Sequence, residues 1–237
     1  MSWSGSFSYS WNPPPPPRRI TTSRKELIHL GSAYVVLTGC LVLLFSNNTY
    51  IGHTFSPPTF TGITATIVVV AALAALTGFA AHEMAHKVVA QRLGFWAEFR
   101  ASPSGLIMAA FTTYLGFIFA APGATVVADT GGMGPRSWGR TSLAGPMTNV
   151  AFAALFYLAS MVAFVVGSVL FVWLLDLAFI NAWFGTFNLF PVGVLDGHKV
   201  FRWSPGIWAS AIATTLAAMV LAVLALYVFG TPLLSLG

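Results

Sequence analysis

The sequence is poor in charged residues and has almost no cysteine. Only 7% of its 237 residues are charged, with six Asp and Glu and eleven Lys and Arg, whereas soluble domains carry roughly 25%. This shortage excludes a soluble globular fold, because a water-facing surface of that size needs several times more charge. The single cysteine, Cys40, lies in an apolar run, which excludes an internal disulfide and a cysteine-based metal site.

The sequence is rich in apolar residues. They make up 57% of the chain, which excludes intrinsic disorder, because disordered chains are poor in apolar and aromatic residues. We therefore predict an α-helical polytopic membrane protein with the lipid bilayer as its surroundings. The net charge of +5 does not indicate nucleic acid as a partner, because basic residues in membrane proteins mark the cytosolic loops.

The positions of the basic residues predict the topology. Lys and Arg fall into three blocks, at 18–25, 87–140 and 199–202. If positive charge stays inside, each gap between blocks holds an even number of crossings, and the C-terminal segment can hold one more. About five spans of roughly 20 residues result, with the N-terminus on the cytosolic side of the cell membrane. They are expected at 27–45, at 62–86, at 206–229 and as two helices that divide 142–190 near Gly167.

The apolar stretch 105–128 is the exception to this pattern. It is long enough to span, but a crossing would place basic residues on both sides of the membrane, and Pro122 and Gly123 interrupt it. We expect a membrane-associated β-hairpin or re-entrant segment, covered by protein or by a wet cavity. A sixth transmembrane helix is the alternative.

This topology predicts four regions along the chain. They are a disordered, Pro-rich cytosolic tail at 1–25, the first span and an outer loop at 26–61, a core at 62–202 that includes a β-region at 97–128, and a last span at 203–237.

The segment His82-Glu83-Met84-Ala85-His86 carries the clearest chemical signal. Two histidines at i and i+4 share one helix face, so both imidazoles can bind one Zn²⁺ ion. The glutamate lies next to the first histidine and can take a proton from a metal-bound water. Two of the five histidines of the chain occupy these positions in an apolar helix. Two packing histidines are the structural alternative.

A tetrahedral zinc site needs a third protein ligand besides the water, and none follows closely in the sequence. Asp196 is the best candidate, because the fourth span returns to the side where His82 and His86 emerge, and Pro and Gly residues break the helix there. Asp176 is the rival, near the outer end of that span. A turn role before Gly197 is the structural alternative for Asp196.

Three motifs make the chain resemble the site-2 protease family of intramembrane zinc metalloproteases. They are His82-Glu83-Met84-Ala85-His86, Ala144-Gly145-Pro146-Met147-Thr148-Asn149, and Asn188 to Pro191 followed by Leu195-Asp196-Gly197. The resemblance implies a core of three helices around one zinc ion per chain, with a β-region after the first motif. It also implies His82, His86 and Asp196 as zinc ligands and Glu83 as the catalytic base. Where many members have a second glycine, this chain has His198, either a further polar group of the site or an interfacial residue.

Three further predictions concern the substrate. Asn149 is expected to donate to the scissile carbonyl, or alternatively to bond across helices. Asn188 is expected to have a structural role. Residues 114–121 are expected either to offer a β-edge that holds an unwound substrate strand or to be an apolar plug.

Together these observations predict a zinc endopeptidase that cuts within or near a transmembrane helix of a membrane-protein substrate, with the site open to the cytosol. A metal transporter would need further ligands along a path, and the sequence has few. A catalytically idle protein that binds transmembrane helices is the third possibility.

Overall fold

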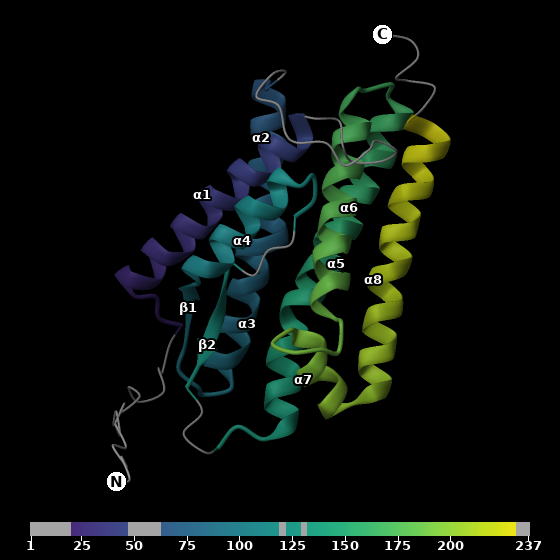
Figure 1. Cartoon of the computed structure of the whole chain (residues 1–237). Helices are drawn as coiled ribbons and strands as arrows, with labels where there is room; N and C mark the ends of the chain where they lie inside the picture. The colour runs from purple at the N-terminus through teal and green to yellow at the C-terminus, as the bar shows by residue number, and fades with distance from the viewer. Residues whose placement is uncertain (1–19, 47–62, 119–121, 129–131, 231–237) are drawn as a thin grey trace.

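The computed structural model in Figure 1 is largely helical. It describes residues 20–46, 63–118, 122–128 and 132–230. The predicted Pro-rich tail before residue 20 and nearly all of the predicted outer loop lie outside these residues.

The prediction of about five spans is confirmed. The described residues contain five helices that are long and apolar enough to cross a membrane. They are α1 (Arg24–Ser46), the continuous helix of α2 (Ala65–Ala75), η1 (Leu76–Ala80) and α3 (Ala81–Arg92), α5 (Pro135–Val165), α6 (Leu170–Asn188), and α8 (Pro205–Ala225), which η2 (Leu226–Gly230) prolongs. The break between α5 and α6 falls where it was expected, at Gly167, whose φ of +68° suits glycine.

A small β-region follows α3, as the sequence predicts. Strand β1 (Ala97–Ala101) pairs antiparallel with β2 (Gly123–Val127), so that Phe99 lies opposite Thr125. The two strands are not joined by a tight turn, because the helix α4 (Pro103–Tyr114) lies between them. Ser102 starts this helix by accepting a hydrogen bond from the backbone N–H of Gly105 at 3.2 Å.

Two alternatives for this region are wrong. A sixth spanning helix is excluded, since α4 has only 12 residues and crossing the hydrocarbon needs about 20. The β-edge expected at 114–121 is also misplaced. Tyr114 ends a helix, the described residues up to 118 form no strand, and the strand begins at Gly123. Pro122 and Gly123, taken as a break in an apolar run, mark the start of that strand.

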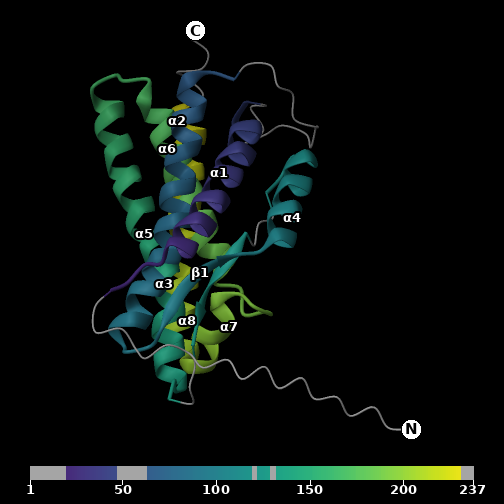
Figure 2. The same ribbon diagram turned by 90° about the vertical axis from the view of Figure 1, so that its left-hand side faces the viewer.

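The elements divide into a long helical bundle and a group of short elements at one end. Figures 1 and 2 show α3, β1, β2 and the short helix α7 (Asp196–Trp203) at this end. Figure 2 places α4 beside α1 at one edge of the molecule and α5 at the opposite edge. Helices α1 and α2 are in contact, and their fully buried residues include Ala33, Ala71, Ala74 and Ala75. Small side chains let neighbouring helices approach closely.

Residues 20–25, at the end of the predicted tail, contact α3 and lead into α1. The backbone N–H and C=O of Thr21 are both hydrogen-bonded by the side-chain amide of Gln91, at 3.0 and 3.1 Å. Helix α1 already begins at Arg24. The side-chain amide of Gln91 donates one of these hydrogen bonds and accepts the other. It thereby binds residues 20–23 to α3 in the way that a neighbouring strand binds an extended backbone.

A buried ion pair fixes α1 against α3 and the sheet. The ammonium of Lys87 donates to Glu26 at 2.5 Å and to the hydroxyl of Thr22 at 2.7 Å. The second oxygen of Glu26 accepts the backbone N–H of Phe99 at 3.0 Å. Lys87 and Glu26 are 1% and 0% exposed. Such a pair tolerates burial best when further hydrogen bonds support it, as those to Thr22 and Phe99 do here.

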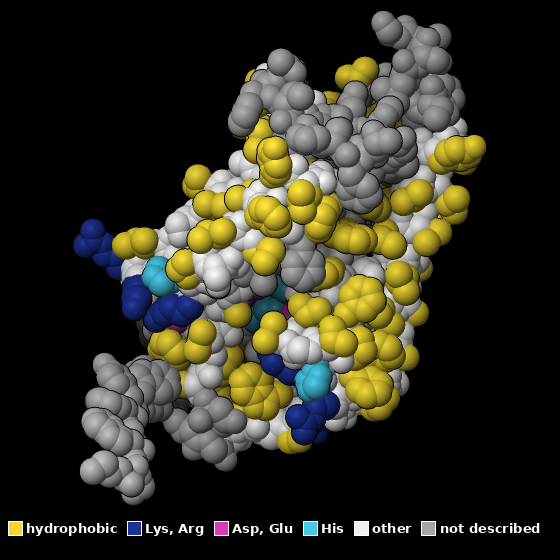
Figure 3. Space-filling model, in the orientation of Figure 1, with side chains coloured by type: hydrophobic (Ala, Val, Ile, Leu, Met, Phe, Trp, Pro, Cys, Tyr) yellow, Lys and Arg dark blue, Asp and Glu magenta, His cyan; other side chains and the backbone are white. Residues whose placement is uncertain are grey.

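The basic side chains gather at the same end of the bundle. On the face shown in Figure 3, Lys and Arg lie toward the end that carries the sheet and α7, while hydrophobic side chains cover much of the rest. This distribution follows the three basic blocks of the sequence and agrees with a multi-pass membrane protein.

Candidate metal centre

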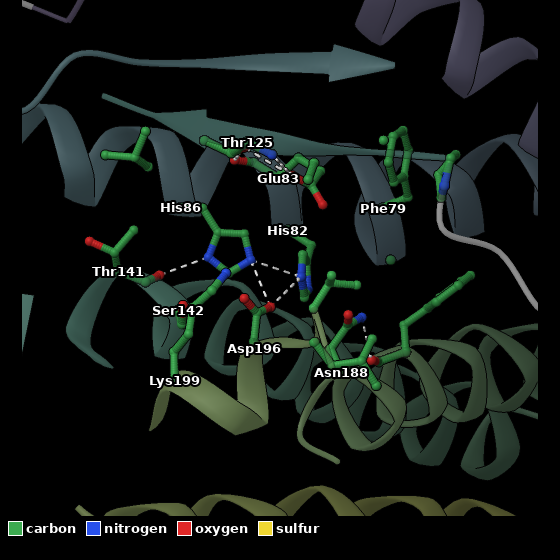
Figure 4. Close-up of a pocket in the computed structure, with 18 of the residues that line it drawn as sticks. Phe79, His82, Glu83, His86, Thr125, Thr141, Ser142, Asn188, Asp196 and Lys199 are labelled. Atoms are coloured by element: carbon green, nitrogen blue, oxygen red, sulfur yellow. Dashed lines mark hydrogen bonds and ion pairs between the residues drawn. The ribbon is translucent and has the colours of Figure 1, made fainter. Parts of the chain in front are cut away.

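The two histidines of the first motif meet on one face of α3. The Nε2 atoms of His82 and His86 are 3.0 Å apart, and both residues are buried. Asp196, the first residue of α7, brings its Oδ2 atom to 3.3 Å from His82 and 3.0 Å from His86. Figure 4 shows the three side chains pointing toward one another. The structure thus brings together the three predicted ligands, close enough to hold one metal ion.

The hydrogen bonds behind the histidines determine which nitrogen faces the centre. Nδ1 of His86 lies 2.7 Å from the backbone oxygen of Thr141, which can only accept a proton. Nδ1 of His82 lies 2.6 Å from Oδ1 of Asn149, whose NH₂ group donates to the backbone oxygen of Gly78 at 3.0 Å. Neutral histidines therefore carry their protons on Nδ1, and both Nε2 lone pairs face Asp196.

This donor set fits a zinc ion. Two imidazole lone pairs and a carboxylate oxygen converge, and none of the three supplies a proton to the others when the histidines are neutral. Their separations of 3.0–3.3 Å match the roughly 3.3 Å between ligands of a tetrahedral zinc with bonds of about 2.0 Å. The hydrogen bonds to Nδ1 are those that usually orient metal-binding histidines.

Helix α5 passes directly over the ligands at Gly145. A Cβ atom at this position would lie 2.6 Å from Nε2 of His82, and still closer to Nε2 of His86. No side chain fits there without displacing the imidazoles. The glycine of the second motif therefore leaves space for a metal ion beside the two imidazoles, because it has no side chain.

Asn149 is hydrogen-bonded to two groups of α3 and η1 in this structure. Its side chain is fully buried, and both ends of its amide are used, by His82 and by the backbone of Gly78. A donor for the scissile carbonyl would need a free N–H that faces the cavity. The structure instead places Asn149 behind the metal centre, where it holds the ring of His82, so the alternative of a bond between helices fits better.

The break between α6 and α7 places Asp196 beside His82 and His86. Helix α6 ends at Asn188, and Gly197 packs so tightly on the backbone of Leu189 that a side chain there would overlap it. Burial opposes ionisation of the Asp196 carboxyl, but when the imidazoles are protonated, the charge of His86 and hydrogen bonds from both rings outweigh burial and lower the pKa of Asp196 below its usual range. Asp196 is thus held as a carboxylate, the form in which it can bind a metal.

Glu83 lines the same cavity, of about 130 Å³, as His82, His86 and Asp196. Its Oε2 atom accepts two hydrogen bonds from Thr125 on β2, from the backbone N–H and from the hydroxyl, both at 2.9 Å. Figure 4 shows this contact on the side of α3 that faces the sheet.

The outer edge of β2 faces this cavity. The N–H groups of Phe99 and Thr125 both point away from the strand pair, to Glu26 and to Glu83. Their pair is therefore one of the non-hydrogen-bonded pairs of an antiparallel ladder, which recur at every second residue. Gly123 and Val127 share this orientation, and both line the cavity. An extended peptide could pair with β2 along these three residues.

The remaining predicted residues lie apart from the metal ligands. Asp176 is in α6, outside the residues that converge with His82. Asn188 lines the cavity, and its NH₂ group donates to Phe184 one turn earlier at 3.0 Å. His198 lines a neighbouring cavity. Sequence reasoning missed Thr141, which acts through a backbone oxygen and leaves no signal, and Thr125, a hydroxyl within an apolar strand.

Comparison with known proteins finds one informative relative. The chain is 38% identical over 161 residues to a protein of Methanocaldococcus jannaschii named "Putative zinc metalloprotease", and the match covers 67% of this chain and 81% of the relative. No protein-family model matches the chain. No solved structure matches it either.

Proposed function

The chain belongs to the family of this archaeal zinc metalloprotease, and on that premise we propose that it is an intramembrane endopeptidase of the site-2 protease type. It would cut a peptide bond within or near a transmembrane segment of a membrane-protein substrate, as in regulated intramembrane proteolysis. One observation carries the proposal: His82, His86 and Asp196 share a cavity with Glu83 and the outer edge of β2.

The chemistry follows from the residues around this cavity. A zinc ion held by His82, His86 and Asp196 would lower the pKa of a bound water and polarise the peptide carbonyl. Glu83 accepts the proton of the attacking water, whose oxygen forms the new bond to the carbonyl carbon. Glu83 then donates the proton to the amine nitrogen as the C–N bond breaks. Asn149 and Thr141 keep the two imidazoles in the required tautomer and orientation.

The outer edge of β2 supports a way to hold the substrate. A transmembrane helix uses its backbone N–H and C=O groups internally, so it must unwind before it can be hydrolysed. The unwound segment can pair with β2 through main-chain hydrogen bonds. Such pairing needs the N–H of Thr125, which now holds Glu83. Binding of the strand and release of the Glu83 carboxylate are therefore coupled.

The distribution of charge supports an orientation for the site. The metal centre lies at the end of the bundle where the basic residues gather. By the positive-inside rule this end faces the cytosol. Water would thus reach the cavity from the cytosolic side of the cell membrane.

Two variants test the proposal without knowledge of the natural substrate. We expect purified wild-type protein and Glu83→Gln to hold about one zinc per chain, and Asp196→Ala to lose it. Cleavage is then measured on a panel of reporter proteins, each with one transmembrane segment. Loss of the proton acceptor in Glu83→Gln should lower the cleavage rate by about 10²–10⁴-fold.

Each result separates this proposal from the other two functions. Zinc uptake into sealed vesicles without cleavage would indicate a transporter. Reporter binding that Glu83→Gln leaves unchanged, again without cleavage by the wild type, would indicate an idle binding protein. Full zinc retention by Asp196→Ala would refute the ligand assignment.

A further inference from the structure

A second cavity, of about 370 Å³, adjoins the metal centre. Its lining residues come from the start of α5, the segment before it, and α7; they are Met133, Pro135, Trp138, His198, Lys199 and Arg202. Trp138 and Lys199 also line the cavity of the metal centre. The two cavities therefore share a wall, and Figure 4 shows Lys199 next to Asp196.

The second cavity is basic. Lys199 and Arg202 are one turn apart on α7, and no Asp or Glu is among the lining residues. Neither cation forms an ion pair with an acid in the described part of the chain. The ammonium of Lys199 lies over the ring of Trp138, 5.7 Å from its centroid. A cation–π contact positions this charge and leaves N–H donors for an anion.

Packing fixes the helix that carries these charges. Trp203 lies against α5 at Gly139, where a Cβ atom would overlap its ring. Val200 is 0% exposed, and Gly197 is packed on the backbone of Leu189. The helix that carries both cations is therefore fixed on α5 and at the end of α6. Preorganised charges bind an anion with little further cost of ordering.

We propose that this second cavity is a substrate subsite that takes an Asp or Glu side chain from the segment next to the scissile bond. The inference rests on the proposed function and adds a preference to it. A peptide that extends from the metal centre along Trp138 and Lys199 would reach the second cavity, because both residues line both spaces. A carboxylate there meets Lys199 and Arg202, and charge-assisted hydrogen bonds to such groups are among the strongest in proteins. The shared wall favours a peptide over an anionic lipid headgroup, whose binding would require no link to the metal centre.

The test measures binding of a matched peptide series to the Glu83→Gln protein in neutral detergent. Each fluorescent apolar peptide carries a single Glu at one position, and its partner carries Gln at that position. At the position that reaches the subsite, we expect the Glu peptide to bind about tenfold more tightly, the size expected for one hydrogen bond to a charged group. Adding Lys199→Gln and Arg202→Gln together should reduce this difference to less than twofold.

A charge-matched control variant tests whether the preference for Glu depends on Lys199 and Arg202 in particular. Arg24→Gln with Lys25→Gln removes the same two residue types from exposed positions at the start of α1, and it should keep the tenfold preference. Equal binding of Glu and Gln peptides at every position would overturn the subsite. So would a preference that survives Lys199→Gln with Arg202→Gln.

A second experiment measures binding to micelles doped with phosphatidylglycerol. If Lys199→Gln with Arg202→Gln abolishes lipid binding and alters no peptide preference, the site is a lipid site.

Zinc content keeps this inference separate from the proposed function. All variants should hold as much zinc as their parent, because neither cation is a ligand. A protein that binds zinc and cleaves but shows no acidic preference refutes the subsite alone. A protein that shows the preference through Lys199 and Arg202 but never cleaves retains the binding site and refutes the protease.

Discussion

Among single residues, Gly145 shows most clearly how the metal centre is built. The ligands have their donor atoms 3.0–3.3 Å apart under the backbone of α5, and this approach exists only because that position has no side chain. Interiors are packed too closely for an added methyl group to go unnoticed. The same helix also supplies the Thr141 oxygen and the Asn149 amide that hold the rings from behind.

We predict that Gly145→Ala disrupts the metal centre more than the fold. Its Cβ would displace the imidazoles of His82 and His86, so zinc affinity should fall at least about tenfold, in the range seen when groups that orient metal ligands are lost. The measurement is zinc affinity by competition with a chelator, alongside the melting temperature in detergent.

Gly132→Ala is the matched control. Gly132 is exposed, and a Cβ atom there would contact nothing within 4 Å beyond its neighbours in the described part of the chain. The same substitution at this position should therefore leave zinc affinity unchanged. Wild-type affinity in Gly145→Ala would mean that α5 can move away from the histidines, and it would contradict the tight approach described above.

Among secondary-structure elements, β2 has two edges with different roles. One edge pairs with β1, and the other presents every second backbone N–H to the metal centre. The alternation follows from the ladder itself and does not depend on side-chain identity. This distinction allows the two roles to be tested separately by substitutions at one residue.

Thr125→Pro removes the N–H that faces the metal centre and leaves the ladder to β1 intact, because proline is tolerated where a strand's N–H points away from its partner. We expect this variant to bind zinc normally and to lose at least about tenfold in cleavage of reporter proteins.

Thr125→Val separates the hydroxyl from the backbone. It keeps the N–H and should retain most of the cleavage activity. Equal activity of Thr125→Pro and Thr125→Val would show that the substrate does not pair at this position, whereas loss of zinc in Thr125→Pro would show that the sheet supports the ligands.

Elements with a strong local signal could be predicted from the sequence. The spans follow from apolar length and the gaps between basic residues, and the pairing of His82 with His86 follows from helical spacing. Asp196 could be identified because Pro and Gly residues mark the helix break before it. Each of these signals lies within a few residues of the chain.

The sequence could not reveal features that depend on distant backbone groups. The strand at Gly123–Val127 lies within the predicted β-region at 97–128 but after the predicted edge at 114–121, because α4 ends only at Tyr114. The hydrogen-bond partners of Asn149 could not be read from the sequence for a related reason. Its partners, His82 and the carbonyl of Gly78, are 67 and 71 residues away, and a polar residue one turn into a helix looks the same whether it faces a cavity or another helix.

For the whole molecule, the basic side chains distinguish one end of the bundle from the other. The start of α1 carries Arg24 and Lys25, whereas the connection between α5 and α6 lies at the opposite end and has no basic residue. By the positive-inside rule, this asymmetry predicts the orientation in the membrane. It also decides from which compartment the metal centre is reached.

We predict opposite labelling of two engineered cysteines in a Cys40→Ala background. Val166→Cys, at the end of α5 where the native side chain is 71% exposed, should react with an impermeant maleimide on intact cells. Lys25→Cys should react only after lysis. The reverse pattern would place the metal centre on the outer side, and equal labelling of both positions in intact cells would indicate a mixed topology.

The buried pair of Glu26 and Lys87 has a consequence for biosynthesis. The two residues are 61 positions apart, so the ribosome adds Lys87 roughly 3–12 s after Glu26 at about 5–20 residues per second. During that interval the first helix carries a carboxylate without its cation. Because Glu26 lies in the first turn of α1, at the predicted cytosolic end of the helix, its carboxylate would stay in contact with water until α3 arrives. A chain that stops before residue 87 would keep this uncompensated charge and present it to the cell's quality-control proteases.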